Sequence, residues 1–199
     1  QLGAIDAATS VAVSYTSVSD TASNLAADAA TNGGAGTYVT AGVDVTVSTV
    51  ASVAQLAAID GANTTGSLSY GAVSDTAAHL YADAQLNGGS GLYVSGSHAV
   101  SVTDTPSVAQ LNAIAQATSG VVTATLSGTT AGLLGLSDGQ ENAYTLTVTD
   151  AATVGQLATL DAKTSIALVY TSIRDTAANL VANQGGYVSG TVVVEVSDT

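Results

Sequence analysis

One short motif, Ser/Thr-x-x-Asn/Gln-Leu, recurs along the whole chain and limits what the chain can fold into. Its leucines follow one another at intervals of 23, 31, 24, 31, 23, 23 and 23 residues: Leu2, Leu25, Leu56, Leu80, Leu111, Leu134, Leu157 and Leu180. The basic step is about 23 residues, and the two intervals of 31 contain eight extra residues. Such a period predicts one supersecondary unit copied end to end, not a domain built around a unique site. We therefore expect residues 1–199 to form a single repeat segment, cut from a longer array.

Each repeat contains a short stretch with helical periodicity. Apolar residues lie three apart in Ala-rich sequence, as at Val53, Leu56 and Ile59, which predicts a short amphipathic helix with one buried stripe. Residues that favour helix N-caps precede these stretches: Ser52, Asp75, Ser107 and Asp175.

After each helical stretch the apolar residues alternate with small or polar ones, which predicts a strand with one buried face. These runs are Val11, Val13 and Tyr15; Val43, Val45 and Val47; Leu68 and Tyr70; Val100 and Val102; Leu146 and Val148; Ile166, Leu168 and Tyr170; and Val192, Val194 and Val196.

The two predicted elements match in length, since a helix of ~10 residues rises ~15 Å and a strand of ~5 residues covers ~16 Å. Strands joined through a helix pair in parallel by a right-handed crossover. The sequence thus predicts an α/β solenoid of about eight 23-residue coils with a parallel sheet. We expect the helices on one face, because the Ser/Thr side of the strands is too polar to lie beneath them. Helices on alternating faces are the other arrangement.

Two repeats carry eight extra residues with a Gly-rich sequence, Asn32-Gly-Gly-Ala-Gly-Thr-Tyr38 and Asn87-Gly-Gly-Ser-Gly-Leu-Tyr93. Glycine at this density supplies positive φ angles and predicts tight loops after the helix. Tyr38 and Tyr93 end these loops and form a candidate ligand surface. Exposed, clustered rings at these positions would favour carbohydrate binding, whereas buried rings would favour a packing function.

Composition excludes several classes of function. Fifteen acidic residues against Lys163 and Arg174 give a net charge of −13, which repels nucleic acids and anionic membrane surfaces. No apolar stretch is long enough to insert into a membrane, and no secretory signal is recognisable. The chain has no cysteine and only two histidines, and it contains no nucleophile or phosphate-binding motif, so we expect no catalytic residues and no enzyme.

Aligned carboxylates give the one candidate cofactor, Ca²⁺. Asp104, Asp150 and Asp198 share a position just after a strand, where they could bind Ca²⁺ with backbone carbonyls or cap the following helix. A second candidate set, Asp75, His79 and Asp83, lies along one side of a helix and offers a metal-ligand stripe or a solvated face.

A third repeated position carries amides or His, which could form a hydrogen-bonded ladder between coils or point into solvent: Gln1, Asn24, Gln55, His79, Gln110, Gln156 and Asn179.

The phrases Ser52-Val-Ala-Gln-Leu-Ala-Ala-Ile-Asp60, Asp175-Thr-Ala-Ala-Asn-Leu180 and Val100-Ser-Val-Thr-Asp104 resemble the Ala/Thr-rich tandem repeats of very large secreted bacterial proteins. These are adhesins, surface-layer-like proteins and proteins with RTX-type tails. The Gly-Gly-x-Gly of the inserts is similar to half of the RTX calcium nonapeptide, but a tyrosine replaces its Asp. The resemblance implies an extracellular, cell-surface location and no catalytic residues.

Two functions are consistent with these patterns. The first is a structural spacer of an exported bacterial surface protein, whose partners are neighbouring copies of itself or flanking repeats stacked end to end. The alternative is an adhesin module that binds surface carbohydrate or Ca²⁺.

Overall fold

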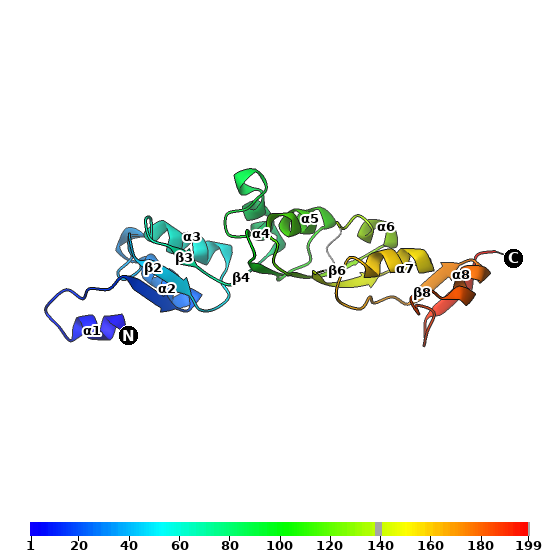
Figure 1. Cartoon of the computed structure of the whole chain (residues 1–199), viewed down its shortest axis with the longest axis horizontal. Helices are drawn as coiled ribbons and strands as arrows, with labels where there is room; N and C mark the ends of the chain where they lie inside the picture. The colour runs from blue at the N-terminus through cyan, green and yellow to red at the C-terminus, as the bar shows by residue number, and fades with distance from the viewer. Residues whose placement is uncertain (138–140, 199) are drawn as a thin grey trace. The chain divides into compact units, whose positions relative to one another are not determined.

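A computed structural model describes residues 1–137 and 141–198 of the chain. Strands and helices alternate along it, and neighbouring strands pair in parallel, so the fold is mixed α/β as the sequence predicts (Figure 1). The chain divides into two compact units, 1–75 and 76–199.

The helices are short, as expected for repeats of this length. In the first unit they are α1 (Leu2–Ala7), α2 (Ala22–Ala29) and α3 (Val53–Ala62), with a 3₁₀ turn η1 (Thr31–Gly33). In the second unit they are α4 (Ala77–Ala84), α5 (Val108–Ala117), α6 (Thr130–Leu133), α7 (Val154–Asp161) and α8 (Ala177–Ala182), with a 3₁₀ turn η2 (Leu86–Gly88).

The strands lie between the helices in sequence. The first unit contains β1 (Ser17–Asp20), β2 (Asp44–Val47), β3 (Leu68–Ser69) and β4 (Ala72–Asp75). The second contains β5 (Ala99–Val102), β6 (Val122–Gly128), β7 (Ala143–Val148), β8 (Ser172–Asp175) and β9 (Val193–Val196).

Strand pairing is parallel throughout and has the same register at equivalent positions. In the first unit β2 lies between β1 and β3, with Thr46 opposite Ser69. In the second unit β6 pairs with β5 and β7, and β8 pairs with β9. A single bridge joins Thr147 of β7 to Val169. Thr147 and Val169 occupy the same positions in their repeats as Thr46 and Ser69, so the two pairings have the same register.

Helices that follow one another pack side by side in each unit. α2 contacts α3 in the first unit, and α4 contacts α5 in the second.

Most leucines of the motif lie in the core, as the helical spacing predicts, whereas Leu2 is half-buried. Leu56, Leu80, Leu111 and Leu157 are completely buried, and Leu25 is nearly so. Each lies four residues after the N-cap of its helix.

In α6 this position belongs to Leu133 and not to Leu134. Leu133 lies four residues after the N-cap Thr129 and is 2% exposed, whereas Leu134 is the half-buried C-cap. Because Leu133 and Leu134 are consecutive, the spacing of the leucines in the sequence did not reveal that the motif is shifted by one residue in this helix. The corrected intervals on either side are 22 and 24 residues.

Two predicted N-caps are confirmed and two are wrong. Ser52 and Ser107 cap α3 and α5. Asp75 and Asp175 instead end strands β4 and β8, and the caps of the next helices are Thr76 and Thr176. The hydroxyl of each threonine accepts the N–H three residues on, so the carboxylate before it is available for another contact.

The alternation pattern located strands β2, β3, β5, β7 and β9, misplaced β1 and β8, and did not include β6. No strand forms at 11–15, and at 166–170 only Val169 makes a bridge. The strands of these repeats, β1 and β8, begin just after the tyrosine that ends each run. Four-residue strands such as Ser-Val-Ser-Asp hold too few apolar residues to produce a recognisable alternation.

Candidate functional site

The contacts that recur between successive repeats are the most conspicuous arrangement of polar groups in both units. In six places an oxygen at or just after a strand accepts the first helical N–H of the preceding repeat. The pairs, acceptor first, are Thr49 with Ala22, Asp75 with Val53, Asp104 with Ala77, Asp150 with Thr130, Asp175 with Val154, and Asp198 with Ala177, at 2.6–3.1 Å. We call these six contacts the inter-repeat caps.

The inter-repeat caps explain where the three Ca²⁺ candidates lie. Asp104, Asp150 and Asp198 each direct one carboxylate oxygen to a helix N-terminus, where the unpaired N–H groups and the helix dipole favour a negative charge. They bond to the first N–H of the preceding helix, and not to the following helix that their place after a strand suggests. In the described part of the chain, no three His, Cys, Asp or Glu side chains group closely enough to bind a metal ion. Asp75, His79 and Asp83 therefore do not come together as a set of three metal ligands.

Hydrogen bonding lowers the pKa of several of these carboxyls. The N–H and hydroxyl of Thr130 lower the pKa of Asp150. The side-chain amide of Asn179 is the main cause of a lowered pKa at Asp175, and Asn24 has the same effect on Asp20. In every case hydrogen-bond donors stabilise the ionised form.

A second recurrent contact connects the segment after a helix to a residue in or next to the strand before that helix. The Thr164 hydroxyl donates to the carbonyl of Tyr144 at 2.7 Å and accepts the N–H of the same residue at 2.9 Å. Thr118 donates in the same way to the carbonyl of His98 at 2.7 Å. Thr164 is 8% exposed and Thr118 is 7% exposed, so both side chains are buried.

Each Gly-rich insert folds around a carboxylate of its own. Asp83 Oδ2 accepts the N–H groups of Leu92, Tyr93 and Val94 at 3.2, 2.9 and 2.7 Å. Asp28 holds Thr37, Tyr38 and Val39 in the same way. The loops are tight, as predicted.

The tight turn depends on glycine and on one asparagine. A Cβ on Gly36 would lie 1.9 Å from the Val39 carbonyl oxygen, and Gly36 has a φ of +71°. Asn87 also has a positive φ and donates to the carbonyl of Gly91, as Asn32 does to Gly36.

The tyrosines that end the inserts contact their own fold. The Tyr38 ring packs at a tilt against Tyr15, with centroids 6.3 Å apart, and its hydroxyl donates to Asp6 at 3.4 Å. In the last repeat Tyr187 packs on Tyr170 and donates to Asp161 at 3.2 Å. Burial is the main cause of the raised pKa of Tyr38 and Tyr187.

Tyr93 is 6% exposed and its backbone N–H belongs to the Asp83 contact. Neither Tyr38 nor Tyr93 therefore projects freely as a binding platform.

The repeated amides form contacts within their own repeat. Gln55, Gln110 and Gln156 each accept the N–H of their helix N-cap through Oε1, which closes a capping box. Asn24 and Asn179 donate to Asp20 and Asp175 of the preceding strand. These five amides therefore make local contacts, as capping boxes or as bonds to the strand just before their helix, and form neither of the two arrangements considered, a ladder between coils or simple exposure to solvent.

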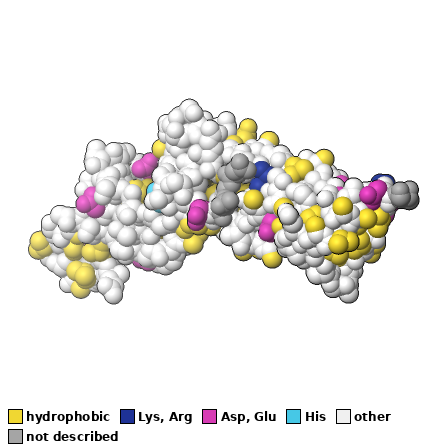
Figure 2. Space-filling view, turned by 45° about the vertical axis from the view of Figure 1, so that its right-hand side comes forward, with side chains coloured by type: hydrophobic (Ala, Val, Ile, Leu, Met, Phe, Trp, Pro, Cys, Tyr) yellow, Lys and Arg dark blue, Asp and Glu magenta, His cyan; other side chains and the backbone are white. Residues whose placement is uncertain are grey.

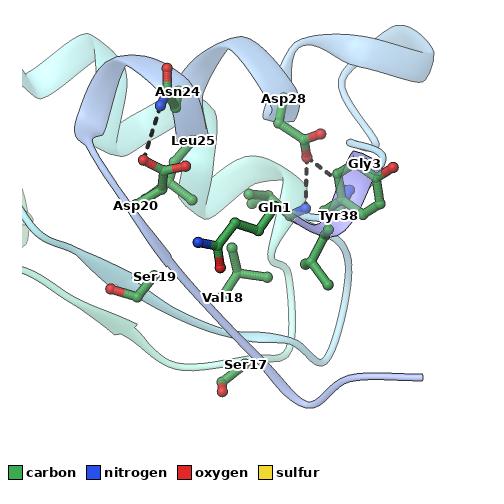
Figure 3. Close-up of a pocket in the computed structure, with 12 residues that line it drawn as sticks. Gln1, Gly3, Ser17, Val18, Ser19, Asp20, Asn24, Leu25, Asp28 and Tyr38 are labelled. Carbon is green, nitrogen blue, oxygen red and sulfur yellow. Dashed lines mark hydrogen bonds between the residues drawn. The ribbon is translucent and has the colours of Figure 1, made fainter. Parts of the chain in front are cut away.

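Hollows open on the surface of both units. One of about 580 Å³ lies between α1, β1 and α2, where Asp20 and Asn24 bond to each other and Asp28 reaches the backbone of Tyr38 (Figure 3). Another of about 640 Å³ runs beside α5 and includes Asn112 and Gln116. Asn112 is engaged there, since its amide donates to Gly135 and accepts from Ser137.

The two cationic side chains also serve structural contacts. Lys163 is 6% exposed, and its ammonium donates to the Leu136 carbonyl at 2.6 Å. Arg174 pairs with Glu195 across β8 and β9 at 3.4 Å, and both side chains are exposed.

Sequence reasoning missed the inter-repeat caps and the carboxylate at the centre of each insert. The signal was present, because an Asp recurs at the strand end and another at the helix end before each Gly-rich insert. It was ambiguous, since a carboxylate near a helix start fits its own helix, a metal or a neighbouring repeat equally well.

Comparison with protein-family models, with curated proteins and with solved structures finds no match for this chain. None of the helices in the described residues is long and apolar enough to cross a membrane.

Proposed function

We propose that the chain is a structural spacer of an exported bacterial cell-surface protein. It forms an α/β solenoid of about eight repeats with the helices on one face, and it associates end to end. The observation that carries this proposal is the set of inter-repeat caps, because most of the recurrent carboxylates bond to a neighbouring repeat and none of the three Ca²⁺ candidates is left to form a metal site.

Several further features support a passive, extended function. The side-by-side packing of α2 with α3 and of α4 with α5 fits helices on one face of a continuous stack. The Tyr93 ring is buried, and the Tyr38 ring packs on Tyr15 while its hydroxyl bonds to Asp6. Both arrangements favour packing over carbohydrate binding. A net charge of −13 on a surface rich in Ser and Thr keeps such an array hydrated and apart from other anionic surfaces.

The proposal is tested by duplicating residues 21–75 between Asp75 and Thr76. Asp20 and Asp75 are equivalent and lie 55 residues apart, so the duplication adds complete repeats in register. In a repeat stack, stability and exposed surface increase with each added repeat. The urea m-value should therefore rise by about a quarter, in proportion to length.

A Gly/Ser linker of equal length at the same site is the control and should leave the m-value unchanged. If the duplicated segment behaves like this linker, or is digested by a protease while the rest stays intact, the repeats do not stack. The location is tested separately by protease treatment of intact cells, which should remove the segment from the surface.

A further inference from the structure

Each of the two long inserts has an Asn-Gly pair in its turn, Asn32-Gly33 and Asn87-Gly88, and no other asparagine in the chain is followed by glycine. Glycine has no side chain to shield its own backbone nitrogen, so this nitrogen is well placed to attack the side-chain amide of the asparagine before it. Both asparagines are exposed. The insert of the second unit projects from the surface in two views of the molecule (Figures 1 and 2).

The backbone of the folded insert blocks this attack. Asn87 has a φ of 51° and a ψ of 37°, and Asn32 has a φ of 52° and a ψ of 35°. In this left-handed conformation the next nitrogen lies almost opposite Cβ around the Cα–C bond, whereas the attack needs it on the same side as Cβ. The side-chain amide is also bonded, since Asn87 donates to the Gly91 carbonyl at 2.8 Å and Asn32 to that of Gly36 at 2.7 Å.

The carboxylate at the centre of each insert maintains the closed conformation. Asp83 accepts the three N–H groups that follow Gly91, and Asp28 accepts the three that follow Gly36. The attack requires a large rotation of ψ in the turn that these bonds close. An Asn-Gly pair therefore reacts only after its insert has opened and has lost its bonds to the carboxylate.

We infer that Asn32 and Asn87 are sites of spontaneous deamidation, and that Asp28 and Asp83 control the reaction by holding the inserts closed. The inference does not depend on the proposed spacer function, because it concerns the chemistry of the inserts alone.

The reaction needs only water. In the open insert the Gly88 nitrogen attacks Cγ of Asn87 and loses its proton, the bond from Cγ to the side-chain nitrogen breaks, and ammonia leaves. A succinimide ring results. Water then adds to one of the two ring carbonyls and breaks its bond to the Gly88 nitrogen. The product is aspartate or, where the backbone now runs through Cβ, isoaspartate.

Neither product fits the closed insert. Both lack the N–H donor that Asn87 directs to Gly91, and both add a negative charge to an insert that already folds around Asp83. Isoaspartate also lengthens the backbone by one methylene group. A reacted insert should therefore stay open, so the modification records that the insert has opened once.

The last repeat provides a chemical comparison. Asn183 has the same left-handed conformation, with a φ of 40° and a ψ of 45°, but it is followed by Gln184. The side chain of Gln184 hinders the approach of its own nitrogen, so we expect Asn183 to remain unmodified. Gln184→Gly should make Asn183 react as fast as Asn87 when the chain is unfolded.

The first test follows deamidation at each asparagine by mass spectrometry of peptides from the full chain, incubated at mildly alkaline pH in buffer and in urea. In urea Asn32 and Asn87 should react faster than every other asparagine. In buffer both should react at least about tenfold more slowly, because the insert must open first. Equal rates in buffer and in urea overturn the protection by the fold, and unreactive pairs in urea overturn the sites themselves.

Two reciprocal variants test the control by the carboxylates. In buffer, Asp83→Ala should raise the rate at Asn87 at least about tenfold and leave Asn32 unchanged, because the two inserts belong to different compact units. Asp28→Ala should do the reverse. Circular dichroism establishes that each variant is folded, and the corresponding Asp→Asn variant replaces one that is not. A folded variant that raises both rates alike, or neither, overturns the assignment to the carboxylates.

A third measurement tests the consequence of the reaction. Protein aged until Asn87 has reacted should be cut within 84–97 by a protease that leaves fresh protein intact, because an open loop is the preferred site of cleavage. If aged and fresh protein resist the protease equally, the reacted insert closes again and does not record its opening.

Discussion

Removing the carboxylate of Asp83 should destabilise the second unit strongly. This side chain is 3% exposed, and one of its oxygens accepts three consecutive backbone N–H groups of the insert. Two of the bonds are short and have buried donors, at Tyr93 and Val94. A hydrogen bond to a charged group contributes about 1.5–3 kcal/mol, so Asp83→Ala should lower the free energy of unfolding by about 3–5 kcal/mol.

The isosteric variant separates charge from shape. Asp83→Asn keeps an acceptor oxygen in the same place but removes the charge, and charge-assisted bonds are roughly twice as strong as neutral ones. Its cost should be about half that of Asp83→Ala. The last repeat is consistent with this, since Asn183 accepts the N–H of Val188 at 2.8 Å through its amide oxygen.

Urea unfolding followed by circular dichroism measures these differences, and amide hydrogen exchange at Tyr93 and Val94 locates them. Glu195→Ala is the matched control, because its exposed ion pair with Arg174 is worth about 0–1 kcal/mol. A loss below about 0.5 kcal/mol for Asp83→Ala would refute the reasoning, because substitutions away from structural features have effects of that size.

Three further predictions concern the core, the pH dependence and metal removal. Leu133→Ala should cost about 2–5 kcal/mol in urea unfolding and Leu134→Ala clearly less, because only Leu133 occupies the buried position of the motif; equal losses would contradict the corrected register. Lowered pKa values at Asp20, Asp150 and Asp175 stabilise the fold above the unfolded-state pKa of about 4. This stability should be lost as the pH falls through the folded-state values, and Asp150→Asn should flatten the acid side of a plot of stability against pH; an unchanged slope would contradict the assignment. EDTA should leave the Tm unchanged, because the three Ca²⁺ candidates bond to helix N-termini, and a drop in Tm would indicate a cation site that the described residues do not form.

The mixed α/β fold with parallel pairing was predictable from the sequence, because it follows from local patterns repeated many times. Helical spacing around Leu56 and Leu111, and alternation around Val45 and Val100, each place apolar residues on one side of an element. Repetition made the average signal strong even where one repeat was irregular. It failed locally at Leu133 and Leu134, where two adjacent leucines fit the same spacing.

The partners of the polar residues were decided by the tertiary structure alone. Asp75 follows the sequence pattern of an N-cap, but the strand extends to it and its carboxylate reaches Val53 of the preceding repeat. Asp83 lies on a helix stripe whose pattern suits metal ligands or a solvated face, but the insert folds back over it. Periodicity indicates which face of an element a residue occupies, whereas a hydrogen bond depends on which segment lies opposite, and only the tertiary packing of the segments determines that.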